Sequence, residues 1–545
     1  GPLDLRRLRE SFLRVVDAFD ILRTVFVCHH GQFFQVVLRK VRPDIFVHET
    51  EQSLDEYTNG LQKRDREQDP RQGEQYVQFY VVKKKNSDQH RILIRMSHAQ
   101  FDGVCLPKIM NAIKLGYEGS TLPPVFSFSN YMRMLPGNIT PAHYHHWSTI
   151  LKGSKMTDII RRTQPNTFMH IGAFAEQKKT IMIPSTAIGN VTLATVMQSA
   201  WAVTLAKLTA QSDVVFGLTV NGRNASVPGI ETTVGPCLNI LPIRVKFREH
   251  WTGLDLFRYL QDQQIANMPY ESLGFREIIR NCTDWPDSTY FTTSVFHQNV
   301  EYEGQMHLDG NSYRMGGVGV LDNFTDLTLA SKSCGQEKLD VSIGYSLKGP
   351  IPATFIAKAL NMVCETVQSL IANPSVPLAS PATIRSLPSQ VIRETPRASD
   401  TPFLSSNLNS QKMSEIVIHS DILTRSWQQV LPRRTDNPQY QLDASFFDLG
   451  GDIMNVAQLV WILGEEGFSV RLEDLLEHHT FLGMMAVMAM HHKPELNARM
   501  AATMAEEPAK EMRMTMTKSN SWSSLGKAMT LAKRFTRWGA VAAKK

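Results

Sequence analysis

The stretch Ser97-His98-Ala99-Gln100-Phe101-Asp102-Gly103 decides how the rest of this 545-residue sequence is interpreted. A strand-like run, residues 91–96, precedes it, and a helix-like run, residues 107–117, follows it. A histidine at the end of a strand is held rigidly by its sheet, and a neutral imidazole can accept or orient the proton of an amine or hydroxyl. We therefore predict that His98 is a catalytic residue.

Asp102 and Gly103 complete this candidate site. Asp102 lies at a turn, where its carboxylate is predicted to pair with a cation and fix the loop rather than to transfer a proton. Gly103 permits close approach of the backbone, whose N–H groups nearby would stabilise an oxyanion. The H-x-x-x-D-G pattern alone is short, and a single histidine before a turn more often has a structural role. The wider sequence has to decide between the two interpretations.

The sequence around this stretch alternates between strand-like and helix-like runs as far as residue 390. Helices are predicted at residues 5–19 and 191–209 from the spacing of their apolar residues. The Pro-rich residues 122–136 are predicted to join two lobes. This alternation is typical of an α/β or α+β fold. Strands are predicted at residues 24–28, 76–82, 91–96, 213–218 and 240–245.

The composition is that of a soluble globular protein, with 42% hydrophobic and 20% charged residues, and the length predicts two to four folding units. No stretch approaches the roughly 18 apolar residues of a membrane-spanning helix, so membrane partners are not expected. The net charge of +6 comes partly from a basic tail, and no nucleic-acid-binding signature accompanies it. The six cysteines form no CxxC pair, so no disulfide framework or metal site is predicted, and a cytoplasmic location fits.

Several elements resemble, in the right order, the motifs of nonribosomal peptide synthetase condensation domains, relatives of chloramphenicol acetyltransferase. Residues 97–103 are similar to the family's HHxxxDG motif, with Ser97 in place of its first histidine, whose role is structural. The resemblance covers most of residues 1–390. The other matches are Phe19-Asp20-Ile21-Leu22-Arg23-Thr24 to HxxLRT, Asn130-Tyr131 to DY, Gly222-Arg223 with residues 234–244 to GR…VGxFxNTLPxR, Pro269-Tyr270-Glu271 to PFE, and His297-Gln298-Asn299 to a strand ending in QN.

The resemblance implies a two-lobed fold, with lobes at roughly residues 1–150 and 151–390. It also implies a salt bridge between Arg23 and Asp102 that supports the loop, and a place for Asn239 beside the substrate tunnel. The sequence opens at Gly1 without the family's first strand and opening motif, so an N-terminally truncated domain is expected.

Tyr117 moves the resemblance toward one subgroup. The pattern Ser-His-x-x-x-Asp-x14-Tyr is similar to that of fungal terminal condensation domains, which release a chain by cyclisation or join units through amide or ester bonds. This implies that Tyr117 contacts the tunnel or the substrate. A tyrosine that packs at the end of a helix is the alternative. The segment Cys282-Thr283-Asp284-Trp285-Pro286 and the unit behind the linker favour the synthetases of hydroxamate siderophores.

Beyond a Ser-, Pro- and Thr-rich linker, residues 391–415, the sequence of residues 416–490 resembles a four-helix peptidyl carrier protein. Carrier proteins attach phosphopantetheine to a serine that follows Gly-Gly-Asp, at a helix N-terminus whose N–H groups suit the phosphate. Ile453 stands at this position, and Ser445 belongs to an apolar run and is assigned to packing. No covalently bound cofactor is therefore predicted for this carrier-like domain.

Residues 491–545 are predicted to be a flexible tail. Within it, residues 522–540 carry apolar side chains between basic ones. An amphipathic helix that binds a partner or a membrane surface would explain this pattern, and so would a loosely ordered tail.

The predicted function is amide or ester formation from a carrier-bound thioester, with His98 accepting or orienting the proton. Phosphopantetheine would come on the carrier domains of the same synthetase, with an adenylation domain upstream. Two alternatives stay open at this point. One is a free-standing acyltransferase that uses acyl-CoA, and the other is a catalytically silent module that only docks carriers.

Overall fold

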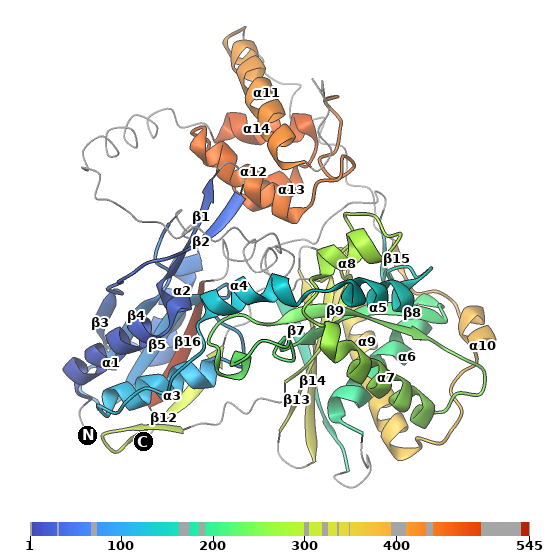
Figure 1. The fold of residues 1–545 in the computed structure, drawn as a ribbon, viewed down its shortest axis with the longest axis horizontal. Coiled ribbons are helices and arrows are strands. Elements are labelled where there is room, and N and C mark those ends of the chain that lie inside the picture. The colour runs from blue at the N-terminus through green and yellow to red at the C-terminus, as the bar shows by residue number, and fades with distance from the viewer. Residues whose placement is uncertain are drawn as a thin grey trace.

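The computed structural model describes the chain except residues 1–2, 30–31, 67–72, 163–173, 185–190, 299–304, 319–324, 335–336, 348, 394–409, 432–439, 492–535 and 544–545. Figure 1 shows two sheet-containing lobes side by side, with a small helical domain above them. The predicted α/β architecture is therefore confirmed.

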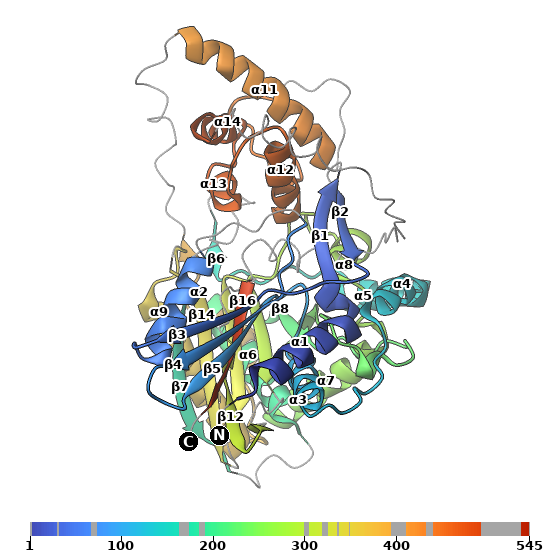
Figure 2. The same cartoon turned by 90° about the vertical axis from the view of Figure 1, so that its left-hand side faces the viewer.

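The first lobe is built on a six-stranded sheet in the order β11-β12-β16-β5-β4-β3. Alternate residues of its strands face opposite sides, so Phe79 and Ile94 lie in the core under α1 (Leu5–Ala18) and α3 (Leu106–Tyr117), whereas α2 (Leu54–Arg66) packs on the other face (Figure 2). The strands are β3 (Ile45–Thr50), β4 (Gln78–Lys84), β5 (His90–Ser97), β11 (Gln305–Leu308), β12 (Asn311–Val318) and β16 (Thr536–Ala543).

Close packing of α1 on α3 fixes the helix that follows the His98 loop. Ser11 donates from its hydroxyl to the carbonyl oxygen of Ile113 at 2.6 Å, and Gly116 leaves room for this approach because a β-carbon there would collide with the Ser11 side chain. On the sheet side, the rings of Phe12 and Phe79 stack with their centroids 4.0 Å apart. The loop between β5 and α3 therefore has a rigid element at each end.

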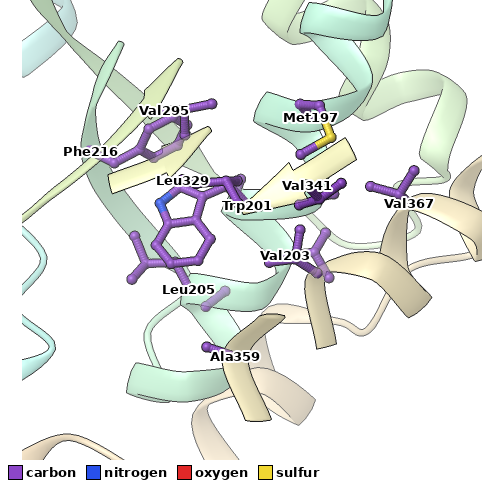
Figure 3. Close-up of a cluster of buried hydrophobic side chains, with 14 of the residues drawn as sticks. Met197, Trp201, Val203, Leu205, Phe216, Val295, Leu329, Val341, Ala359 and Val367 are labelled. Atoms are coloured by element: carbon purple, nitrogen blue, oxygen red, sulfur yellow. The ribbon is translucent and has the colours of Figure 1, made fainter. Parts of the chain in front are cut away.

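The second lobe has a six-stranded sheet in the order β7-β14-β13-β10-β8-β9. Figure 3 shows Trp201 of α6 (Leu193–Thr209) surrounded by Phe216, Val295 and Leu329 from this sheet. Its indole Nε1 donates to the hydroxyl of Thr293 at 3.3 Å, which satisfies its one polar group. The strands are β7 (Phe174–Met182), β8 (Asp213–Val220), β9 (Asn239–Lys246), β10 (Thr293–Gln298), β13 (Leu327–Ser333) and β14 (Lys338–Ser346).

Helices cover both faces of this second sheet. α6 and α9 (Ala353–Ala372) share one core with α7 (Gly253–Asn267), and α5 (Pro141–Leu151) and α8 (Phe275–Cys282) pack on the opposite face. Among the described residues, α9 alone is long and apolar enough to cross a membrane by length and composition, so the statement that no stretch approaches this length was wrong. Its apolar face packs in the core of the lobe, which accounts for its hydropathy.

The two lobes are not successive pieces of the chain. The hairpin β11–β12 comes from the second half of the sequence but joins the first sheet, where Leu308 and Tyr313 lie in the first lobe's core. Residues 122–136, predicted as a joining stretch, include most of helix α4 (Phe128–Asn138), which lies between the lobes (Figure 1). The remaining short elements are η1 (Asp20–Arg23), β1 (Thr24–His29), β2 (Gln32–Val37), β6 (Ile160–Arg161), η2 (Ile230–Thr232), η3 (Met268–Tyr270), α10 (Pro381–Ser386) and β15 (Ile392–Arg393).

The carrier-like domain consists of α11 (Ser410–Val430), α12 (Ile453–Glu465), α13 (Leu472–Glu477) and α14 (Phe481–Met490). α11 begins inside the stretch predicted as a linker. The core is aromatic, with Trp427 fully buried against Phe446 and Phe481 at ring-centroid distances of 5.1 and 5.0 Å. Four helices of this kind match the predicted carrier architecture.

The tail differs from its prediction where it is described. Residues 492–535, which include most of the predicted amphipathic helix, lie outside the described residues. The following segment forms β16, which pairs antiparallel with β5, from Thr536 opposite Ser97 to Ala542 opposite Arg91. The end of the predicted helix is therefore a strand, because backbone pairing inside the sheet overrides the helical spacing of its apolar residues.

Buried histidines predict a loss of stability in acid. Burial is the largest cause that lowers the pKa of His90, which contacts the Tyr313 hydroxyl, and of His146, which hydrogen-bonds Asn267 at 2.8 Å. Because the unfolded chain then binds more protons than the native one, the free energy of unfolding should fall as the pH drops below about 6.5. Urea unfolding at about pH 7.5 and about pH 5.5 measures how steeply the free energy of unfolding changes with pH.

The variant His90→Gln should reduce that pH slope, since it removes one of the groups that titrates differently in the two states. His145→Gln is the matched control, because His145 is exposed. Equal slopes in the two variants would contradict the assignment.

Candidate active site

His98 lies directly after β5 and is half-buried. Its Nδ1 lies 2.7 Å from the carbonyl oxygen of Phe101, and its ring stacks on the Phe101 ring at a centroid distance of 4.9 Å and an angle of 12°. A carbonyl accepts only, so Nδ1 carries the proton, and in the neutral ring the lone pair is on Nε2. The loop thus fixes both the tautomer and the orientation of the imidazole.

Ser97 is fully buried and holds the start of this loop. Its hydroxyl accepts from the N–H of Ala99 at 3.2 Å. The side chain of Gln100 accepts from the Ser97 N–H at 3.2 Å and donates to the carbonyl oxygens of Ile21 and Thr24 at 3.1 and 3.2 Å. This geometry supports the structural role proposed for Ser97, and Gln100, which the sequence did not single out, ties the loop to η1.

Asp102 makes a buried, bidentate ion pair with Arg223. The guanidinium contacts the two carboxylate oxygens at 2.7 and 3.1 Å, and the exposed fractions of the two side chains are 7% for Arg223 and 2% for Asp102. The carboxylate also accepts from the N–H groups of Cys105 at 2.9 Å and Cys237 at 3.0 Å. Burial opposes the charge of Arg223, but the neighbouring Asp102 carboxylate prevails and raises the Arg223 pKa. Asp102 therefore holds the loop, and Gly103 lies in the turn that leads from it toward α3.

The predicted salt bridge between Arg23 and Asp102 is wrong. Arg23 instead donates from Nη1 to the carbonyl oxygens of Leu38 and Arg39, at 2.5 and 3.3 Å. Arg23 is the last residue of η1, and its side chain contacts the residues directly after β2. Arg223 instead follows β8 in the chain and reaches Asp102 from there. The resemblance assigned the cation to the wrong element, although Gly222-Arg223 was itself a recognised motif.

Gly222 explains how the backbone that carries Arg223 comes so close to the loop. Its φ of 66° is in the left-handed region, and a β-carbon there would collide with the carbonyl oxygen of Cys237.

The two thiols beside the ion pair are not nucleophiles in this setting. Burial raises the pKa of Cys105 well above its usual range and that of Cys237 to about 12.

Asn239 extends the site along the start of β9. Its amide donates to the carbonyl oxygens of Glu271 at 2.8 Å and Leu273 at 3.1 Å, and the Glu271 carboxylate accepts from the N–H and the side-chain amide of Asn224. Burial raises the Glu271 pKa. The structure thus places Asn239 two residues from Cys237, where it anchors the segment before α8.

Tyr117 is not brought near His98. It ends α3, while His98 precedes that helix, and a 12-residue helix spans about 18 Å. Its buried hydroxyl contacts the Asp309 carboxylate and accepts from the N–H of Asp4 at 3.0 Å, and Arg7 lies over its ring at 4.3 Å. Burial is the first cause that raises the pKa of Tyr117 to about 12. The contact with substrate is therefore not supported, and the packing alternative describes this tyrosine.

A cavity of about 190 Å³ lies in the second lobe, between α6, α9 and α10, where Val203, Leu370 and Ile384 are among its lining residues. None of the predicted site residues lines it. Within the described part of the chain, no group of three His, Cys, Asp or Glu side chains is placed to hold a metal ion.

In the carrier-like domain, the position after Gly-Gly-Asp is the first residue of α12, Ile453. Asp452 caps this helix, with Oδ1 accepting from the N–H groups of Met454 at 2.7 Å and Asn455 at 2.9 Å. Ser445 is buried and lies 3.1 Å from Nδ1 of His479. The geometry of the helix N-terminus is that of a carrier, but its side chains offer no hydroxyl for phosphopantetheine, so the residues present do not fit the group.

Comparison with known proteins assigns a family to the condensation part and to the carrier-like part of the chain. The condensation-domain family matches residues 1–392, and the family of phosphopantetheine attachment sites matches residues 421–487. The chain is 67% identical over 548 residues to Nonribosomal peptide synthetase 1 of Aspergillus fumigatus and 64% identical over 566 residues to Nonribosomal peptide synthetase nlsA of Emericella nidulans. These alignments cover 100% and 99% of this chain but only 9% of each relative.

Solved structures support the same fold. "The crystal structure of CT" shares 26% identity and a TM-score of 0.62, over 69% of this chain and 86% of that one. The condensation domain of the Monacolin K polyketide synthase MokA, at 17% identity and a TM-score of 0.56, covers 70% of this chain and 92% of that one and shows the fold alone. The chain therefore belongs to the condensation-domain family of nonribosomal peptide synthetases, which are acyltransferase-type enzymes, and carries a domain of the phosphopantetheine-attachment family behind it.

Proposed function

We propose that this chain forms an amide or ester bond from a carrier-bound thioester in the last condensation or release step of a peptide synthetase. The lone pair of an amine or hydroxyl forms the new C–N or C–O bond at the thioester carbonyl carbon, the C–S bond breaks, and the thiolate leaves. The proton of the nucleophile passes to Nε2 of His98 and from there to the leaving thiolate. Atoms and charge balance without a further reactant.

The observation that carries this proposal is the fixed imidazole of His98. The Phe101 carbonyl accepts from Nδ1–H, which places the lone pair of the neutral ring on Nε2, and the strand end and the Asp102–Arg223 pair hold the loop around it. Asp102 is a positioning residue here, since its carboxylate is engaged by a guanidinium and two N–H groups. The oxyanion contact belongs to the backbone near Gly103, in the turn after Asp102.

The terminal role is supported by Ser97 in the motif, whereas the synthetase relatives support condensation only in general. Ser97 performs the structural function at the start of the loop, so the loss of the motif's first histidine is compatible with activity. Tyr117 does not add support, because it packs at the far end of α3. The predicted product remains a fungal peptide or a hydroxamate siderophore.

The substrate's pantetheine arm is proposed to come from other carriers of the synthetase, charged by an upstream adenylation domain. The support is Ile453, which has no hydroxyl to modify. Incubation of the full chain with CoA and a broad phosphopantetheinyl transferase should leave its intact mass unchanged. The variant Ile453→Ser should gain one arm and serves as the positive control. A gained arm on the unsubstituted carrier-like domain would contradict the proposal.

The decisive test of the function is turnover by a His98→Ala variant with a carrier-bound acyl thioester and an amine or hydroxyl nucleophile. Loss of product with an intact fold supports the proposal. A catalytically silent docking module would instead bind carriers without any dependence on His98, and a free-standing acyltransferase would accept acyl-CoA without a carrier.

A further inference from the structure

In the part of the chain that the structure describes, an ion pair at the N-terminus of α12 joins the carrier-like domain to the second lobe. Asp452 pairs through Oδ2 with the guanidinium of Arg276, which lies on α8. The exposed fractions of the two side chains are 7% for Asp452 and 20% for Arg276. The two carboxylate oxygens thus have separate roles, since Oδ1 caps α12 and Oδ2 reaches the condensation domain.

A second, apolar contact comes from the β1–β2 hairpin of the first lobe. The ring of Phe33 meets Trp461 of α12 edge-on, at a centroid distance of 6.2 Å and an angle of 88°. Phe26, Phe33 and Tyr76 belong to the same buried cluster as the core of the carrier-like domain. Figure 2 shows α12 beside the upper end of β1 and β2. The domain is therefore held by both lobes at once.

This docked surface lies next to the catalytic loop. Ala99, the residue after His98, is fully buried in the same cluster. On the other side, Asn239 anchors the segment before α8, and Cys237, two residues before Asn239, donates from its backbone N–H to Asp102. These hydrogen bonds and the short backbone segment between them connect the loop around His98 to the helix that carries Arg276.

Asp452 is the residue directly before the position that bears the arm in a functional carrier. A carrier with an intact Gly-Gly-Asp-Ser presents the same aspartate beside its pantetheine, at the same helix N-terminus. Arg276 is thus placed to recognise a carrier at its loading end, and the hairpin supplies an aromatic contact to the helix behind it.

We propose that the carrier-like domain is a resident pseudo-carrier, which occupies the carrier-docking surface formed by Arg276 and the β1–β2 hairpin and competes there with loaded carriers. It cannot deliver a substrate, because Ile453 holds no arm. A loaded carrier must displace it before an acyl chain reaches His98. This inference rests on the proposed function, in which substrates arrive on carriers.

The first test uses the full chain with Ile453→Ser, whose new hydroxyl reports access to the docked surface. The rate of arm attachment by a broad phosphopantetheinyl transferase is measured alone and with Arg276→Glu. Loss of the ion pair should release the domain and raise this rate on the order of tenfold. Arg258→Glu, an exposed position on the neighbouring helix α7, is the matched control and should leave the rate unchanged. Equal rates for the Arg276 and Arg258 variants would overturn the proposal.

The second test measures competition. The probe is a separate carrier domain with Gly-Gly-Asp-Ser, loaded with a fluorescent pantetheine arm, and its binding to the full chain is followed by anisotropy. Asp452→Asn keeps an oxygen that caps α12 but removes the charge, so the probe should bind on the order of tenfold more tightly. Asp474→Asn, which breaks an ion pair with Arg471 inside the same domain, is the control and should not change binding.

Adding Arg276→Glu to Asp452→Asn should abolish the gain, because the probe then loses its own partner. If Asp452→Asn binds the probe no better than Asp474→Asn, the resident domain does not compete and the proposal fails. Neither measurement depends on turnover. If the His98→Ala variant kept full activity, the two tests would still decide whether the carrier-like domain competes with loaded carriers.

Discussion

Replacing His98 with alanine is expected to lower kcat by about 10²–10⁴-fold, the usual contribution of a positioned general base. The side chain is fixed through Nδ1 by the Phe101 carbonyl and by stacking on the Phe101 ring, so the substitution removes an oriented lone pair rather than a mobile one. The measurement is product formation under saturating carrier-bound thioester, followed by mass spectrometry, so that the change reports kcat and not carrier affinity.

His145→Ala is the matched control for this experiment. His145 is exposed on α5 and belongs to a pair of histidines that fails the motif spacing, so its loss should leave kcat unchanged. Both variants should unfold at denaturant concentrations close to the one at which the unsubstituted chain unfolds, because His98 is half-buried and His145 is exposed. If His98→Ala forms product as fast as His145→Ala, the proposed acyl transfer through this histidine is wrong.

Replacing Arg223 with alanine is expected to lower the free energy of unfolding by about 3–5 kcal/mol. The change leaves the Asp102 carboxylate buried with two N–H donors but without the guanidinium that compensates its charge. The cost arises from an unpaired buried charge and not from the net strength of the pair. Urea unfolding at neutral pH measures it, and product formation should fall as well because the His98 loop loses its support.

The companion variant is Arg23→Ala, which removes the cation that the family resemblance assigned to Asp102. It loses hydrogen bonds to two carbonyl oxygens, so we expect a smaller cost of about 1–3 kcal/mol. Double-mutant cycles with Asp102→Ala separate the two arginines, since only a residue in contact shows a coupling energy of about 0.5–3 kcal/mol. Coupling of Asp102 to Arg23 and not to Arg223 would contradict the observed geometry.

Local patterns were sufficient to predict the elements that frame the active site. The helical spacing of apolar residues predicted α1, which the structure bounds at Leu5–Ala18, and the apolar run before Ser97 predicted β5. These elements have one buried face or a fully buried strand, so their period is visible in the sequence. The strand at Thr536–Ala543 was missed because sheet pairing, and not local preference, determines its conformation.

The site was predicted only as far as its local motif reaches. His98, Asp102 and Ser97 could be singled out because they lie in one loop, where the structure places Ser97 buried beside His98; their roles stay predictions. The partner of Asp102 could not be derived in the same way, because Arg223 is 121 residues away in the chain and reaches it only once the two lobes are packed. Tyr117 matched a spacing, but spacing along a helix does not decide which end of it faces the substrate.

The mixed origin of the first lobe's core has a consequence for biosynthesis. Leu308 and Tyr313, together with Ala225, Val227, Ile230, Val234 and Cys237, complete a core that otherwise comes from the first part of the chain. A ribosome therefore releases the early helices and strands well before the residues that cover them. Contacts of such long sequence separation form late and slowly, and the waiting apolar surface is prone to aggregate. We expect the nascent first lobe to depend on chaperones until the β11–β12 hairpin has emerged.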